Sequence, residues 1–436
     1  MRSKINPNHD WAHRMDHYQK LNSHYFKVLH SQIWITFAII VVLSLATGQI
    51  LIWTLSRDYT AIAAIEKAQN DFMTKRATSK RSSLDKDYGE VNMDECEDPE
   101  NRDNDTSKPD PEWEKNQSIL WRKLKGEVMR APAYSNMFAV FVGTGAQIYM
   151  IWSLLLTYQW ANILSHLDAR PYIWYFLVVS LACTGAINGY TMAKTMRMFG
   201  QSTNWKEMSC VSASMFPLMS VVLIFFIDLL EYVEQAEEEI DISTSLMAFA
   251  LWLAVCIPTT FLGASYGMVN AGGAESVQKV NSIPRPIPAN QPCYLNTVLA
   301  MFISGATIFA SFFAVFHFIW RSIWRSEVHL MLLYMWLFSL LTSIVISELS
   351  IIFTFLRLRA GDYKWQWKAW WIGASSSIFV SGGMLYYMAQ HLALRLYTDD
   401  VVYLLWSILL LVPYFFFSGS TSVLASGMFV NAIYKK

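Results

Sequence analysis

The sequence predicts an all-α, polytopic membrane protein, because its composition, the length of its apolar segments and their pattern agree. Of its 436 residues, 54% are hydrophobic and only 16% are charged, whereas soluble domains carry about 25% charged residues. Nine stretches are long and apolar enough to cross a bilayer, which takes about 20 residues in a helix. None alternates polar and apolar residues as the strands of a membrane barrel do.

The predicted spans follow one another along most of the chain. They are 33–55, 137–157, 172–193, 211–230, 246–268, 297–320, 329–356, 369–391 and 401–430. Hydrocarbon offers no hydrogen-bond partners, so each span must satisfy its own backbone, as a helix does. We therefore predict a nine-helix transmembrane bundle whose first partner is the lipid bilayer.

Basic residues predict the orientation of this bundle. Eleven Lys and Arg residues fall in the short loops and tail on one side, and four on the other. The richer side is expected in the cytosol. Residues 1–32 are then a lumenal juxtamembrane tail, 33–55 the first transmembrane helix and 56–134 a cytosolic loop. Eight further helices occupy 137–430, and 431–436 form a cytosolic tail.

The cytosolic loop offers a direct test of this topology. Residues 85–114 carry thirteen Asp and Glu against three Lys and Arg, a composition typical of disorder. Asn104 and Asn116 each begin a glycosylation sequon. We predict that both stay unmodified, because the cytosol lacks the glycosylation machinery; sugar found on either by glycosidase treatment would place the loop in the lumen.

Charge and cysteine spacing exclude several functions. Basic and acidic residues both number 34, so no net charge favours binding to nucleic acid. The five cysteines show no CxxC spacing, and neither a structural zinc site nor a disulfide scaffold is expected. Hydrolase, metalloprotease and phosphate-loop motifs are absent. The sequence therefore predicts no metal, no cofactor and no enzymatic activity.

Glu348 is an ionisable residue inside an apolar run, 344–352. Comparable charges at a helix centre cost roughly 2.5–3.5 kcal/mol on insertion scales. One interpretation is a contact with the helix of another membrane protein, or a proton-linked switch. The other is a hydrogen bond within the bundle, with Ser347 and Ser350 as neighbouring candidates. The sequence identifies no partner.

Two glycine pairs lie at four-residue spacing, Gly185 with Gly189 and Gly263 with Gly267. Such spacing lets helix backbones approach closely. The pairs indicate either packing inside the bundle or a groove that receives a client helix. Prolines within three spans leave a further function open, an ion or small-solute transporter that uses the Glu348 carboxylate.

Four strings, in this order and spacing, resemble the nonaspanin or transmembrane nine superfamily, whose members are endomembrane protein 70-like. They are Trp121–Pro132, Thr260–Gly267, Ile283–Pro288 and Arg359–Trp367. The loop positions that carry the motifs are Pro284, Arg285, Pro288, Asp362 and Tyr363.

The resemblance implies a protein of Golgi and endosomal membranes, with a lumenal N-terminus and a cytosolic C-terminus. It also implies sorting and surface delivery of client membrane proteins, including those with glycine-rich transmembrane helices. Coat or sorting machinery at the cytosolic face is an expected partner, and no enzymatic reaction is implied. Relative to the family, we expect most of the large N-terminal lumenal domain to be missing from this sequence, either because the chain lacks it or because the sequence is truncated. It also ends in Tyr434-Lys435-Lys436, where the family has a coat-protein signal.

Overall fold

The structure is a computed structural model, and helices dominate the part of the chain that it describes. That part is residues 34–61 with a few positions up to 74, then 124–160, 179–200, 203–233, 242–270, 280–288, 291–324, 328–391 and 397–434, apart from single positions. These residues contain helices, turns and loops and no strand. The tail 1–32 and the acidic stretch with Asn104 and Asn116 lie outside them.

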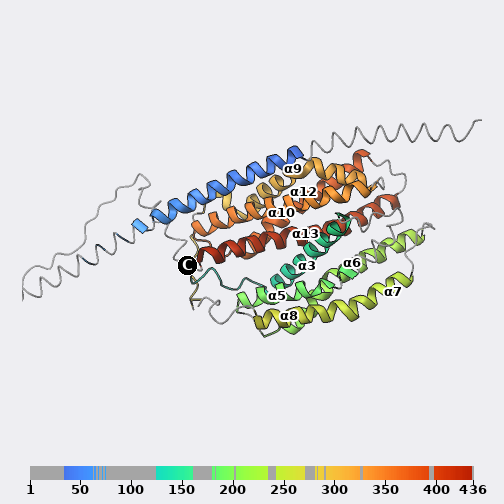
Figure 1. Cartoon of the computed structure of the whole chain (residues 1–436), viewed down its shortest axis with the longest axis horizontal. Coiled ribbons are helices and arrows are strands. Elements are labelled where there is room, and N and C mark those ends of the chain that lie inside the picture. The colour runs from blue at the N-terminus through green and yellow to red at the C-terminus, as the bar shows by residue number, and fades with distance from the viewer. Residues whose placement is uncertain are drawn as a thin grey trace, which may run out of the picture.

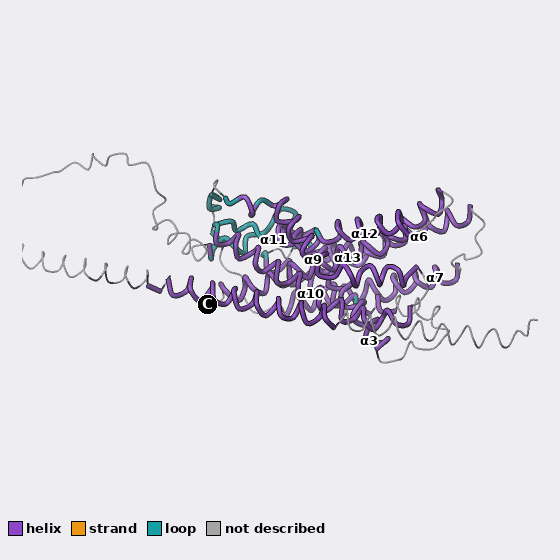
Figure 2. Tube along the Cα trace, turned by 90° about the horizontal axis from the view of Figure 1, so that it is seen from above, coloured by secondary structure: helices purple, strands orange, loops and turns teal. Residues whose placement is uncertain are grey.

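The helices run side by side along the long axis of the molecule (Figures 1 and 2). Their bounds are Trp34–Ala61, α3 Ser135–Trp160, α5 Gly185–Met198, α6 Trp205–Val233, α7 Ile242–Leu251, α8 Ile257–Asn270, α9 Thr297–Trp324, α10 Val328–Arg359, α11 Gln366–Ala374, α12 Ser376–His391 and α13 Tyr397–Tyr434. A π-helix, η2, covers Trp252–Cys256, and a 3-10 turn, η4, covers Cys293–Leu295.

The predicted fold class is confirmed: the protein is an all-α, polytopic membrane protein. Within the described residues, six helices are long and apolar enough to cross a membrane. Three other predicted spans are mainly helical in their described parts, in α5, in α9 and in α11 with α12, with turn positions at Thr184 and Ser375. The third predicted span begins outside the described residues, so the total of nine stays a prediction.

Two predicted spans are not single regular helices. The fifth is not one regular helix: α7 passes into η2 just before Pro258, which has no backbone N–H to donate. The Trp252 indole nitrogen in η2 donates to the Ala213 carbonyl oxygen of α6 at 3.1 Å. The eighth span breaks at Ser375, between α11 and α12. The first helix and α13 also extend beyond their predicted ends, to Ala61 and Tyr434.

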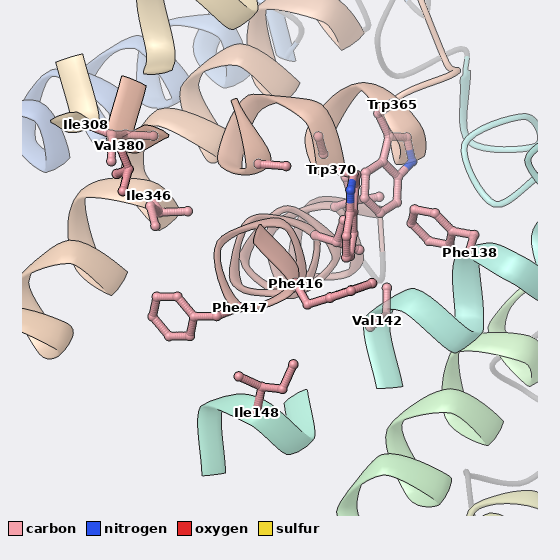
Figure 3. Close-up of a cluster of buried hydrophobic side chains, with 14 of the residues drawn as sticks. Phe138, Val142, Ile148, Ile308, Ile346, Trp365, Trp370, Val380, Phe416 and Phe417 are labelled. Carbon is pink, nitrogen blue, oxygen red and sulfur yellow. The ribbon is translucent and has the colours of Figure 1, made fainter. Parts of the chain in front are cut away.

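The core is organised around α13, which packs against α3, α6, α10, α11 and α12. Figure 3 shows Phe416 and Phe417 on this central helix; Trp370 of α11 lies near Phe416, and Phe417 points to another side of α13. A Cβ atom on Gly145 of α3 would overlap the Phe416 carbonyl oxygen. Glycine in α3 therefore lets the two backbones approach closely at the centre of the bundle.

The first helix is the least buried of the six candidate spans in the described residues. Only 6% of the most apolar window of Trp34–Ala61 is buried, against 17% for the window in α6 and 67% for the window in α3. It lies along the outside of the bundle, as the blue helix of Figure 1. Most of its surface therefore faces the membrane.

Candidate functional site

Glu348 lies half-buried in the middle part of α10 and faces the first helix. The Thr47 hydroxyl donates a hydrogen bond to Glu348 Oε2 at 3.3 Å. Thr47 is the only donor to this carboxylate among the described residues. The same hydroxyl also lies 3.0 Å from the Ser44 carbonyl oxygen on its own helix. The structure thus supplies the partner that the sequence could not identify.

The serines next to Glu348 do not serve as its donors. The Ser347 hydroxyl donates to the Ser343 carbonyl oxygen of α10 at 2.7 Å. The Ser350 hydroxyl points to α13, where it donates to the Ser422 carbonyl oxygen at 2.8 Å. The prediction that Ser347 or Ser350 donates a hydrogen bond to Glu348 is therefore wrong. Ser350 cannot do so because the helical turn directs it to a different side of α10.

The two glycine pairs meet each other inside the chain. A Cβ atom on Gly189 of α5 would overlap the Thr260 carbonyl oxygen of α8, and one on Gly263 would overlap the Ala186 carbonyl oxygen. A Cβ on Gly185 would lie 2.6 Å from Thr259 Oγ1, and one on Gly267 would lie 3.0 Å from Ala193 Cβ. These four positions therefore hold α5 against α8 and do not line an open groove.

A buried amide network connects α3, α5 and α6 near these glycines, and sequence reasoning missed it. Asn188 Nδ2 donates to Gln147 Oε1 at 2.8 Å, and the Ser212 hydroxyl donates to Asn188 Oδ1 at 2.5 Å. Gln147 Nε2 donates to the Leu181 carbonyl oxygen at 2.9 Å. Two amides in neighbouring apolar spans were the available signal. Because the polar groups satisfy one another, the network favours one packing of these helices.

Three of the four motif strings converge at the end of the bundle where the C-terminus lies, in the teal loops of Figure 2. Side chains at the start of α11 bind the backbone of the segment that leads into α3. The indole nitrogens of Trp365 and Trp367 donate to the carbonyl oxygens of Val128, at 3.0 Å, and Ala133, at 2.7 Å. Gln366 Nε2 donates to the Arg130 carbonyl oxygen at 3.1 Å. We call residues 124–134, 280–288 and 360–367 together the loop cap.

The string Ile283–Pro288 is joined to the segment 124–134 through Asn281, which lies just before it. Its backbone nitrogen donates to the Gly126 carbonyl oxygen at 3.2 Å, and Arg130 Nη2 donates to the Asn281 carbonyl oxygen at 2.8 Å. Arg130 also binds the buried Glu127 carboxylate, with Nε at 2.8 Å from Oε2. This hydrogen bond raises the pKa of the Arg130 guanidinium.

Asp362 organises the turn that follows α10. Its side chain is fully buried and pairs with Lys368 and with Arg357 Nη1, the latter at 3.6 Å. Asp362 Oδ1 accepts a hydrogen bond from the Lys364 backbone nitrogen at 3.1 Å. Gly361, before it, has a φ of +80°, a left-handed conformation that glycine adopts without strain. Tyr363 is buried beside it.

The proline loop, Ile283–Pro288, is mostly exposed, in contrast to the buried turn at Asp362. Ile283 is 82% exposed, and Pro284 and Pro288 are exposed as well. Arg285 is half-buried, and Ile287 packs against the main core cluster. The loop is thus anchored at Ile287, while its prolines and Ile283 face outwards. The motif positions therefore divide into a buried group at Asp362 and Tyr363 and an exposed group at Pro284 and Pro288.

Comparison with known proteins agrees with these strings. The family model described as endomembrane protein 70 matches residues 4–396. This chain belongs to the endomembrane protein 70 family. It is 26% identical to transmembrane 9 superfamily member 2 of rat over 72% of this chain and 47% of that protein. It is 23% identical to member 9 of Arabidopsis thaliana over 72% of this chain and 48% of that protein. No solved structure matches.

This member of the endomembrane protein 70 family spans about half the length of the curated relatives it matches. It is an integral membrane protein of that family. Among the described residues, no group of three or more His, Cys, Asp or Glu side chains is placed to hold a metal ion.

Proposed function

We propose that this protein acts in the sorting and surface delivery of other membrane proteins, in Golgi and endosomal membranes. It would do so by lateral packing with the transmembrane helices of its clients, with its N-terminus lumenal and its C-terminus cytosolic. The observation that carries the proposal is Glu348, a carboxylate in the apolar part of α10 whose described donor belongs to a loosely packed helix. Family membership supports the cellular setting.

Lateral packing in a bilayer needs polar contacts or small residues, because lipid tails are as apolar as leucine and drive no association. The glycine pairs of α5 and α8 already contact each other, so we do not place the client there. Among the described residues, the hydrogen-bond donor to Glu348 on this face of α10 comes from the first helix. Glycine-rich client helices suit such a surface because they allow a close approach to a polar group.

The position of Glu348 favours a client contact over a transport pathway. Ser350, two residues later, faces the central helix α13, whereas Glu348 faces the peripheral first helix. A carboxylate that served a route through the bundle centre would be expected on the α13 side. We therefore propose no transport activity and no enzymatic reaction.

The exposed proline loop is the surface that we propose for coat or sorting machinery. Three prolines in Ile283–Pro288 favour an extended polyproline conformation, which loses little entropy when a partner binds it. Ile283 and the prolines point outwards, while Ile287 holds the loop to the core. On the predicted topology this loop lies in the cytosol.

Surface delivery of two single-span reporters tests the proposal. One reporter has a glycine-rich transmembrane helix and the other a leucine-rich helix, and both are expressed with and without the full chain. We expect the chain to raise the surface fraction of the glycine-rich reporter roughly threefold, as about 0.6 kcal/mol per intramembrane hydrogen bond would give. Cell-surface biotinylation measures the fraction. Equal surface fractions of both reporters in both cell lines would contradict the proposal.

A further inference from the structure

The contact between the first helix and α10 is polar and incompletely packed. Thr47 of the first helix contacts α10 through Glu348. Thr47, Ser44 one turn earlier and the adjacent Gly48 are half-buried, while Leu45 and Ile50 of the same helix are exposed. A Cβ atom on Gly48 would find nothing within 4 Å. In the tightly packed α5–α8 pair, by contrast, a Cβ on Gly189 would overlap backbone. Space therefore remains beside Thr47.

One polar group at this contact lacks a partner. Ser44 Oγ is buried and has no hydrogen-bond partner among the described residues. Buried polar groups in folded proteins are nearly always paired, and each exception calls for an explanation. The half-buried Glu348 carboxylate has one donor among the described residues, the Thr47 hydroxyl on Oε2. The contact therefore has hydrogen-bonding capacity that the first helix does not use.

Loss of the Thr47–Glu348 hydrogen bond would cost more free energy on the α10 side than on the side of the first helix. If the first helix moved away, the Thr47 hydroxyl would keep the Ser44 carbonyl oxygen, 3.0 Å away on its own helix. Glu348 would lose its only donor among the described residues. A carboxylate without a donor is expensive in hydrocarbon. The first helix can therefore leave at little cost only when another donor reaches Glu348.

We propose that the α10 face around Glu348 is the docking surface for a client transmembrane helix. The first helix occupies this surface when no client is bound, and in this sense we call it a placeholder. The client would carry a hydroxyl or amide donor flanked by small residues near the middle of its span. The chain's own helix shows the chemistry that fits, with Thr47 as donor and Gly48 beside it. This inference rests on the proposed function and adds which residue of this chain, and which residue types of the client, recognise each other.

The test uses the full chain in membranes with a photo-crosslinking amino acid at Ile344. This position is 43% exposed and lies one helical turn before Glu348 on the same side of α10. The probe is a single-span reporter with Thr-Gly at the centre of its helix, and the matched reporter has Val-Leu there. We expect the Thr-Gly reporter to be crosslinked at least about threefold more than the Val-Leu reporter.

Two variants of the chain are expected to change capture in opposite directions. Thr47→Val removes the internal donor and should raise capture of the Thr-Gly reporter about two- to threefold. Glu348→Leu removes the acceptor and should lower it by a similar factor or more. Thr54→Val is the matched control, because the Thr54 hydroxyl bonds, among the described residues, to the Ile50 and Leu51 carbonyl oxygens of its own helix and to no other helix. It should leave capture unchanged.

A purely structural contact would behave differently, since losing either side of the bond would then loosen the bundle in the same way. Reduced or unchanged capture by Thr47→Val overturns the inference, and this variant decides even if Glu348→Leu is recovered unfolded. Equal crosslinking of both reporters overturns it as well. If Thr47→Val has no effect while the chain still raises surface delivery, the placeholder is rejected and the proposed function stands. If surface delivery never depends on the chain, the proposed function fails by itself.

Discussion

Gly263→Leu is expected to prevent α5 and α8 from packing and to reduce strongly the amount of folded protein. Even a Cβ atom at this position would overlap the Ala186 carbonyl oxygen, and the substitution adds three more carbon atoms. Overpacking a core typically costs 1–3 kcal/mol, and a rigid backbone neighbour should place this variant at about 3 kcal/mol or above. The measurement is the thermal stability of detergent-solubilised protein, followed by size-exclusion chromatography.

Gly382→Leu is the matched control for this experiment. Gly382 lies in α12, and a Cβ there would find nothing within 4 Å. Leucine also has a higher helix propensity than glycine, by roughly 0.5–1 kcal/mol. The control should therefore melt at or slightly above the temperature of the unchanged protein. If both variants melted alike, α5 and α8 would not be in the contact described. If Gly263→Leu instead folded normally and lost only client binding, the pairs would line a groove after all.

Asp362→Ala is expected to destabilise the loop cap by leaving a buried charge without its counterion. Arg357 is 1% exposed, and the described residues offer it one ion-pair partner, Asp362. Removing one member of a buried pair typically costs about 3–5 kcal/mol. The variant should melt well below the unchanged protein in the same chromatographic assay. Limited proteolysis should also cut the segment 124–134 faster, because the α11 start that binds it would shift.

A second substitution separates the lost charge pair from a general loss of packing. Arg357→Met in the Asp362→Ala background removes the orphaned guanidinium, and replacing a buried pair by apolar groups is often nearly neutral. The double variant should therefore be more stable than Asp362→Ala alone. The other partner of Asp362, Lys368, is 28% exposed, so water can hydrate its charge when Asp362 is removed.

Glu207→Ala is the control for losing an exposed carboxylate. It removes one at the start of α6 and should change stability by less than about 1 kcal/mol. Additive losses in the double variant would contradict the ion pair.

The apolar spans were predictable because a bilayer imposes a length and a composition on every helix that crosses it. The interruptions were not, because they depend on contacts between spans. The π-turn at Trp252 is held against α6 by the Ala213 carbonyl oxygen, which no local pattern specifies. The helices also continue past the apolar stretches that define the spans, to Ala61 in the first helix and to Tyr434 in α13.

The candidate sites divide in the same way. Glu348 could be recognised from its surroundings alone, yet its donor lies 301 residues earlier in the chain. Glycine spacing predicted that two helix faces allow close approach, but not that the pairs in α5 and α8 meet each other. The same holds for the amides Gln147 and Asn188. Each can be recognised as a polar residue in an apolar span, but the hydrogen bond between them is evident only from the fold.

The attachment of segment 124–134 to the start of α11 has a mechanical consequence. Tension applied to the chain before Leu124 reaches the indole and amide hydrogen bonds of Trp365, Gln366 and Trp367 before it reaches α3. The load passes from there into α11 and its neighbour α13. Force applied to the chain before Leu124 therefore reaches α11 and the central helix α13 before it reaches α3, although α3 is the next helix in the sequence.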